Sequence, residues 1–215
     1  MSYSTSNEPT LELESELFEQ GVHLVAGVDE VGRGALAGPV TVGVAVIDAG
    51  VGTFPQGLRD SKLISASRRK KLEIPVQEWL IDYAVGSAQA QEIDDIGIIA
   101  ALHLAWTRAM KKLTVAPDHI ILDGKHNWIN SVDPHQSIPT TTRIKADRDC
   151  AVVAAASVLA KVWRDNHMKD LSQQFPIYEW DSNAGYGSAR HMDAIAKCGP
   201  TQFHRQSWSL PEYQG

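Results

Sequence analysis

The sequence contains little cysteine: only Cys150 and Cys198 occur among its 215 residues. Two cysteines so far apart exclude a disulfide framework and a zinc site built from cysteine ligands, and such usage is typical of proteins from a reducing compartment. We therefore expect a cytoplasmic protein whose stability depends on an apolar core. A chain of this length can bury such a core without cross-links.

Long apolar runs are also absent. The most apolar stretch, residues 151–160, is ten residues long and contains Ser157, whereas a membrane-spanning helix needs about 20 residues. Residues 1–20 contain no Lys or Arg and no apolar segment, so they do not match a secretory signal peptide. We expect no membrane association, and we interpret residues 1–11 as a polar, mobile tail.

Positive charge is not in excess. The chain has 20 Lys and Arg against 26 Asp and Glu, which gives a formal net charge of −6. This balance excludes a protein that holds nucleic acid through bulk positive charge, but it allows a local basic track. With 43% hydrophobic and 21% charged residues, the composition is that of a globular protein rather than a disordered one.

The pattern of apolar residues predicts an α/β fold. Apolar or β-branched runs alternate with segments of helical periodicity, which favours a mixed β-sheet flanked by helices. The expected strands cover residues 23–29, 39–47, 83–90, 119–123 and 140–145, and the expected helices cover residues 67–80, 92–113, 150–168 and 188–197. We assign residues 12–175 to this domain and residues 176–215 to a small C-terminal helical lobe.

Two expected helices carry further predictions. In the helix over 92–113, one stripe of large apolar residues should face the sheet. Pro75 lies inside the helix over 67–80 and could kink or divide it. The predicted stripe consists of Ile96, Ile99, Trp106, Met110 and Leu113.

Acidic residues stand where three of the expected strands end. Asp29 and Glu30 end the first strand, Asp123 ends the fourth, and Asp147 follows the fifth. Converging carboxylates repel one another unless a cation neutralises them, and hard oxygen ligands favour Mg²⁺ or Mn²⁺. An Asp at a strand end is also a common turn former or helix cap. Asp147 could merely cap the helix that begins near Asp149.

Two glycine-containing segments could approach a ligand closely. The tripeptide of Gly32, Arg33 and Gly34 follows the first acidic pair. Glycine does not block a sugar or phosphate, and Arg33 can hold a phosphate with two hydrogen bonds. Tyr186 stands between two glycines, so its ring could stack on a base or sugar. Either segment could equally be an ordinary turn.

Basic residues could hold phosphates at several places. Lys62 lies in a polar loop, and Ser157 and Lys161 share one face of the expected Ala-rich helix with Asp165. A solvated Lys62 and a surface ion pair between Lys161 and Asp165 are the simpler alternatives. Four more residues could line a groove, although their spacing does not indicate a metal site: His126, His191, His204 and Arg205.

Two longer motifs are specific. Residues 26–34 and 37–40 read AGVDEVGRG and AGPV, and residues 154–165 read AAASVLAKVWRD. They resemble the opening motif and the Ala-rich helix of type 2 ribonuclease H, the bacterial ribonuclease HII family. Shorter matches keep the family's order and extend the resemblance over roughly residues 22–208: residues 58–63, 121–124, 145–147 and 185–188.

The resemblance implies an RNase H-like fold and an endoribonuclease with Mn²⁺ or Mg²⁺ as cofactor. The substrates would be RNA–DNA hybrids and DNA duplexes containing single ribonucleotides, and the products would carry 3′-hydroxyl and 5′-phosphate ends. The family's four acids fall on Asp29, Glu30, Asp123 and Asp147, with Asp29 bridging two metal ions. Asp149, two positions further on, competes with Asp147 for the last of these roles.

The resemblance also implies how the substrate is held. Gly32, Arg33 and Gly34 would sense the ribose 2′-hydroxyl, the group that separates RNA from DNA, together with Tyr186, which falls on the family's junction-sensing tyrosine. Most phosphate contacts carry no base sequence, so we expect cleavage that is largely independent of sequence. The residues expected to hold flanking phosphates are Lys62, Lys145, Ser157 and Lys161.

Other interpretations stay open. A nucleic-acid-binding protein that does not cleave its ligand could use the same scaffold. Such a protein would be expected to lack some of the four carboxylates, and all four are present in this sequence. Another phosphotransferase of this fold, such as a nuclease acting on DNA, is a further alternative. Residues 125–139 form a somewhat long segment relative to the family pattern, which leaves the shape of this loop open. Nothing in the sequence indicates an oligomer, and we expect a monomer.

Overall fold

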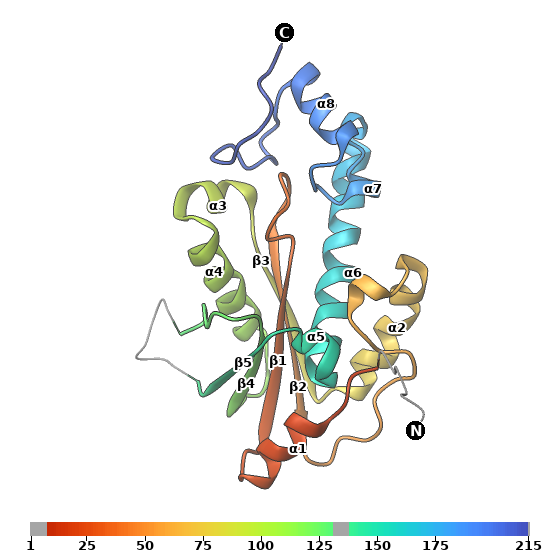
Figure 1. Ribbon diagram of the computed structural model, residues 1–215, viewed down its shortest axis with the longest axis vertical. Helices are drawn as coiled ribbons and strands as arrows, with labels where there is room; N and C mark the ends of the chain where they lie inside the picture. The colour runs from red at the N-terminus through yellow and green to blue at the C-terminus, as the bar shows by residue number, and fades with distance from the viewer. Residues whose placement is uncertain (1–7, 131–137, 215) are drawn as a thin grey trace, which may run out of the picture.

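The computed structural model describes residues 8–130 and 138–214. They contain a five-stranded sheet with the order β3-β2-β1-β4-β5. Its strands are β1 (Leu24–Val31), β2 (Val40–Asp48), β3 (Asp82–Ala88), β4 (His119–Asp123) and β5 (Thr140–Arg143). Strand β2 is antiparallel to β1 and β3, whereas β1, β4 and β5 run parallel. Helices cover both faces (Figure 1), so the predicted mixed sheet flanked by helices is confirmed.

Helix α6 (Ala151–Gln174) lies directly on β1 and β2. The contact is close because glycines face the helix: a Cβ atom on Gly27 would collide with the backbone of Val152, and one on Gly43 with the backbone of Ala156. The Ala-rich start of α6 therefore fits onto a strip of sheet that has no side chains. Figure 1 shows α6 running along one side of the sheet and continuing towards the C-terminal lobe.

The opposite face carries α3 (Ala90–Ile96) and α4 (Ile98–Met110). The sequence predicts one helix here, but Gly97 adopts a φ of 77° and separates the two. The predicted core stripe is wrong in part, because Ile96 and Ile99 are 48% and 41% exposed. Small side chains let α4 approach β3 closely at Gly86, and they form part of the buried face. This face consists of Ala101, Leu102, Ala105, Trp106 and Ala109.

Two further helices pack near α6. Helix α2 (Ala66–Trp79) remains one helix although it contains Pro75. Helix α1 (Glu12–Glu19) meets the start of α6, where the buried Glu14 accepts a hydrogen bond from the Val152 N–H. Residues 1–7 of the predicted tail lie outside the described residues. At its other end, the Thr10 N–H donates to the Asp149 carbonyl at 2.9 Å, so this part of the tail is attached to the domain.

We use the name C-terminal lobe for residues 176–214, which contain η3 (Pro176–Tyr178), α7 (Trp180–Asn183), α8 (Ala189–Cys198) and the segment after them. Its apolar cluster includes Met168 and Leu171 from α6 and Ala37 from the turn between β1 and β2. The lobe therefore packs on the end of α6 and on this turn, as Figure 1 shows. No helix in the described residues is both long and apolar enough to cross a membrane.

Candidate active site

Three acidic residues lie at the same edge of the sheet. Strands β1 and β4 are parallel, and Val28 pairs with Leu122. Asp29 and Asp123 therefore come next on neighbouring strands, and Glu30 follows Asp29. Parallel pairing brings together two segments that are far apart in the sequence. The predicted convergence of the first two acidic strand ends is what the sheet register produces.

Asp147 is brought beside Asp123 by a tight turn after β5. Lys145 adopts a left-handed conformation with a φ of 64°, and α5 (Ala146–Asp149) begins at the next residue. The Ala146 N–H donates a hydrogen bond of 2.7 Å to Asp123 Oδ1. Asp147 is buried, whereas the Asp149 side chain is 45% exposed and forms an ion pair with Arg143. Of the two rival acids, only Asp147 faces the cluster.

The carboxylate of Asp29 is the most buried of the group. Burial raises the pKa of Asp29 to about 8; the Ser157 hydroxyl opposes this rise, and the carboxylates of Glu30, Asp147 and Asp123 add to it. Mutual repulsion of this kind shows that the four carboxylates share one electrostatic site. A positive charge placed among them would be strongly stabilised.

Two other acids of the site are also harder to ionise than usual. Burial raises the pKa of Asp147 to about 6; the carboxylates of Asp123 and Asp60 raise it further, while Lys62 opposes them. Burial raises the pKa of Glu30 as well, against the effect of Arg33. A nearby cation would therefore favour the ionised form of both groups.

The oxygen atoms of the first acidic pair fit a divalent cation. Asp29 Oδ1 accepts a hydrogen bond from the Glu30 N–H at 2.8 Å, and Glu30 Oε1 accepts one from Arg33 at 3.2 Å. Their other oxygens, Asp29 Oδ2 and Glu30 Oε2, are buried without a hydrogen-bond partner among the described residues. Unpartnered buried carboxylate oxygens are suited to Mg²⁺ or Mn²⁺. Within residues 8–130 and 138–214, no group of three His, Cys, Asp or Glu side chains is arranged so that it could hold a metal ion by itself.

Lys62 is a basic residue that contacts the acid at Asp147. It lies in the short helix η1 (Ser61–Leu63), where Asp60 Oδ1 accepts a hydrogen bond from its N–H. Its Nζ atom is 3.4 Å from Asp147 Oδ2, while its side chain is 67% exposed. Lys62 is thus positioned to face both the acids and a ligand that approaches from solvent. Lys145 is likewise exposed.

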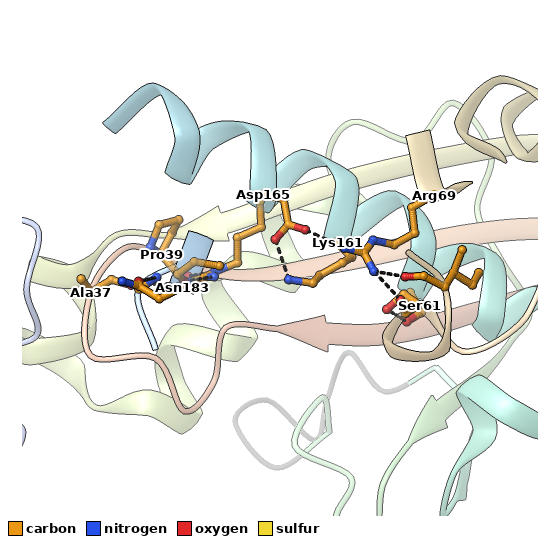
Figure 2. A network of polar contacts seen from close by, with 12 residues as sticks. Ala37, Pro39, Ser61, Arg69, Lys161, Asp165 and Asn183 are labelled. Carbon is orange, nitrogen blue, oxygen red and sulfur yellow. Dashed lines mark hydrogen bonds and ion pairs between the residues drawn. The ribbon is translucent and has the colours of Figure 1, made fainter. Parts of the chain in front are cut away.

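The predicted phosphate-binding face of α6 is differently arranged. Ser157 is fully buried, with its Oγ atom 2.8 Å from Ser61 Oγ. It has no surface with which to bind a phosphate, because α6 packs directly on β1. Lys161 Nζ lies 2.5 Å from Asp165, which also binds Arg69 at 3.1 Å. Figure 2 shows this network, in which Arg69 reaches the loop at Ser61. The ion-pair alternative therefore holds for Lys161.

The loop after β1 is held from inside by Arg205. Its guanidinium donates to the carbonyl oxygens of Gly32 at 2.5 Å and Arg33 at 2.7 Å, and also to that of Gly38. In a trans peptide the N–H points opposite to the carbonyl. The N–H groups of Arg33 and Gly34 are therefore directed away from Arg205. Gly32 has a φ of 84°, a conformation that favours glycine.

A second buried arginine joins this loop to the Tyr186 segment. Arg164 donates to the carbonyl oxygens of Pro39 at 2.8 Å, Ala37 at 3.1 Å and Ala184 at 2.7 Å. Its guanidinium also lies 5.6 Å from the centre of the Tyr186 ring. Tyr186 itself is 39% exposed. The structure thus places Tyr186 beside the turn that begins with Gly32, with its ring accessible to solvent.

Three of the four residues predicted to line a groove do not do so. His191, His204 and Arg205 are buried, because the C-terminal segment folds back onto the turn between β1 and β2; His126 is exposed. The sequence gives no sign that Arg164 and Arg205 hold the loop. No local pattern distinguishes an arginine that binds carbonyl groups from one on the surface.

A mixed sheet of this order, with carboxylates converging where parallel strands end, defines the class of RNase H-like nucleases. A family model for ribonuclease HII matches residues 26–210. The chain is 46% identical over 198 residues to the ribonuclease HII of Streptomyces avermitilis, covering 90% of this chain and 82% of that protein. The chain belongs to the ribonuclease HII family. It is a metal-dependent hydrolase of the ribonuclease H type 2 class, as the sequence resemblance implied.

Solved structures agree with this assignment. The ribonuclease H2 of Pyrococcus horikoshii superposes with a TM-score of 0.70 at 29% identity, covering 86% of this chain and 94% of that one. The Bst-RNase HIII structure in complex with Mn²⁺ has a TM-score of 0.67 at 18% identity, covering 87% and 68%, and this likeness shows the fold alone. Enzymes of the ribonuclease HII family depend on divalent metal ions.

Proposed function

We propose that this protein hydrolyses the RNA strand of RNA–DNA hybrids and cuts 5′ of single ribonucleotides embedded in duplex DNA. The products would carry 3′-hydroxyl and 5′-phosphate ends. The observation that carries the proposal is the pair of buried, unpartnered oxygens on Asp29 and Glu30. They lie where the carboxylates of Asp123 and Asp147 also converge, as the mutual effects on pKa indicate.

Asp29, Glu30, Asp123 and Asp147 would hold two Mg²⁺ or Mn²⁺ ions. When bound, two such ions activate water and stabilise the leaving oxygen in phosphodiester hydrolysis. The protein's own contribution is to present oxygen ligands in a buried setting. Because burial raises the pKa of Asp29 to about 8, its carboxyl group would release a proton on taking up a cation at pH 7.

Substrate contacts would come from the rim of the site. Lys62 and Lys145 are exposed and would bind phosphates on either side of the scissile bond. The outward N–H groups of Arg33 and Gly34, and the Tyr186 hydroxyl, would meet the ribose. A 2′-hydroxyl both donates and accepts hydrogen bonds, which lets such groups separate RNA from DNA. Contacts of these kinds read sugar and phosphate rather than base sequence.

The decisive experiment compares three duplexes of one sequence: all DNA, DNA with one internal ribonucleotide, and a continuous RNA–DNA hybrid. Each is incubated with and without Mn²⁺. We expect cleavage of the second and third duplexes only, dependent on Mn²⁺, with a single cut 5′ of the lone ribonucleotide. Asp123→Asn should remove both activities while the far-ultraviolet circular dichroism spectrum stays that of the folded protein.

Each unexpected result of this experiment would point to a different explanation. Binding of the hybrid without cleavage would indicate a nucleic-acid-binding protein on this scaffold. Cleavage of the all-DNA duplex would indicate a nuclease acting on DNA. Retained cleavage by Asp123→Asn would reject the proposed ligand set.

A further inference from the structure

Two buried histidines of the C-terminal lobe face each other outside the acidic site. His191 belongs to α8, and His204 lies in the segment that follows it. Neither is more than 1% exposed, and their Nε2 atoms are 3.1 Å apart. The indole N–H of Trp180 donates to the same nitrogen of His191 at 3.0 Å. The pair therefore forms the centre of a polar network inside an aromatic core.

Fixed donors determine which ring nitrogen carries each proton. The Thr201 N–H donates to His204 Nδ1 at 2.9 Å, so a neutral His204 carries its proton on Nε2. That proton points at His191 Nε2, which also accepts from the Trp180 indole, so the proton of His191 lies on Nδ1. This Nδ1–H points at the Tyr186 carbonyl oxygen, 2.9 Å away. The chain of hydrogen bonds runs in one direction, from Thr201 to Tyr186.

Both imidazoles are neutral at physiological pH. Burial lowers the pKa of His204 to about 4, and the neighbouring His191 contributes to this shift. Burial also lowers the pKa of His191. Neutral rings keep the directed chain of hydrogen bonds intact, because a doubly protonated ring could not accept from Thr201 or Trp180.

This chain of hydrogen bonds ends at the backbone carbonyl of Tyr186, the residue whose ring would contact the substrate. The Tyr186 carbonyl also accepts a hydrogen bond from the Ser188 N–H at 2.8 Å, so His191 is not needed to close the turn. It adds a second donor that fixes the direction of the carbonyl. The same segment is joined to the turn after β1 through the Gly185 carbonyl, which accepts from the Leu36 N–H at 2.8 Å.

We propose that His191, held in one tautomer by Trp180 and His204, is a positioning residue that sets the placement of Tyr186 and with it the preference for single ribonucleotides over continuous hybrids. This inference rests on the proposed function, in which Tyr186 contacts the substrate at the ribonucleotide. It assigns a function to a buried polar pair that lies outside the acidic site. A displacement of about 1 Å can reduce catalysis by a factor on the order of 100, so a single orienting hydrogen bond is sufficient.

The test compares two side chains of nearly equal shape. His191→Asn keeps an N–H group close to the position of Nδ1, whereas His191→Leu fills similar space without a donor. For each variant, kcat and KM are measured in Mn²⁺ on the single-ribonucleotide duplex and on the continuous hybrid. We expect His191→Leu to lower the ratio of the two kcat/KM values by a factor on the order of 10 or more. His191→Asn should restore most of this ratio.

The Tm of both variants is measured as well. Both leave a similar cavity beside Trp180 and His204, so a similar fall in Tm with different kcat/KM ratios assigns the effect to positioning rather than to stability. If neither variant folds, His204→Gln and His204→Leu make the same comparison one residue earlier in the network, since glutamine keeps a donor towards His191. Folded His191→Leu protein with an unchanged ratio overturns the inference.

Tyr186→Ala is measured in parallel to separate the role of Tyr186 from that of His191. If Tyr186→Ala lowers the ratio and His191→Leu does not, only the inference about His191 fails. If Tyr186→Ala leaves the ratio unchanged, the proposed role of Tyr186 has failed, and the inference fails with it.

Discussion

Arg205 Nη2 donates a hydrogen bond of 2.5 Å to the carbonyl oxygen of Gly32. The contact joins the segment after the last helix to the loop after the first strand, and it is buried on both sides. Burial, and then the nearby charge of Arg164, lower the pKa of Arg205 to about 9. The loop is thus shaped by a cation that binds carbonyl dipoles rather than by its own sequence alone.

Removing this guanidinium should destabilise the protein. Arg205→Met leaves the carbonyls of Gly32, Arg33 and Gly38 without these donors, and a buried unsatisfied polar group costs about 1–3 kcal/mol. We expect the free energy of unfolding in urea to fall by at least about 2 kcal/mol. Arg190→Met is the control, because Arg190 is 80% exposed in a surface ion pair with Glu179, which contributes at most about 1 kcal/mol. Equal stability of both variants would contradict this assignment.

The neighbouring acids Asp147 and Asp149 should differ sharply in function. Asp147 is buried beside Lys62, whereas Asp149 is exposed and pairs with Arg143. We expect Asp147→Asn to reduce kcat on the hybrid in Mn²⁺ by a factor on the order of 100 or more, because it removes a ligand rather than a supporting contact. Asp149→Asn should keep kcat near that of the wild type. A larger loss in Asp149→Asn would reverse the assignment of the fourth acid.

Mn²⁺ should stabilise the folded protein through the acidic site. A ligand that binds only the folded state adds about 2.7 kcal/mol when its concentration is 100 times its Kd. We expect the Tm of the wild type to rise with Mn²⁺ concentration and that of Asp29→Asn to rise far less. Asp193→Asn serves as a matched control, since Asp193 is exposed and pairs with Lys197. An identical rise in all three proteins would mean that the acids only cap turns.

Stability should fall in acid because His204 resists protonation. Its pKa is about 4 in the folded protein against an ordinary value of 6.5, so the unfolded chain binds more protons between these values. Stability contributed by this group is therefore present above pH 6.5 and lost as the pH falls towards 4, at roughly 1.4 kcal/mol for each pKa unit. The measurement is urea unfolding at pH 7 and pH 4.5 for wild type and His204→Gln. The variant should lose less stability over this interval, and equal losses would refute the prediction.

Much of the acidic site was accessible from sequence. An apolar run that ends in Asp29-Glu30, and another that ends in Asp123, identify strand ends that carry acids. Asp147 follows a β-branched run in the same way. These signals are local, since strand ends are set by where apolar residues stop and glycines begin. The order of such segments along the chain also carried the resemblance to ribonuclease HII.

Other features required the packed structure. The sequence predicts Ser157 as a phosphate ligand, yet the glycines of β1 and β2 bring α6 so close that its side chain is buried. The periodicity of large apolar residues predicts only part of the buried face, because α4 meets Gly86 of β3 through alanines, while Ile96 and Ile99 are exposed. The pairing of Lys161 with Asp165 was visible from their spacing on one helix face. The contact of Asp165 with Arg69 was not, because it joins two helices that are far apart in the sequence.

The amino-acid sequence alone determined the mixed α/β fold, the family and the candidate acids, because strand ends and glycine-rich motifs are local patterns. Tertiary structure decided which of Asp147 and Asp149 faces the cluster, and that Arg205 and His191 hold the loops around it. The physical reason is that carbonyl groups and imidazoles carry no sequence signature for their partners. Their hydrogen bonds exist only after the C-terminal segment has folded back onto the turn that follows β1.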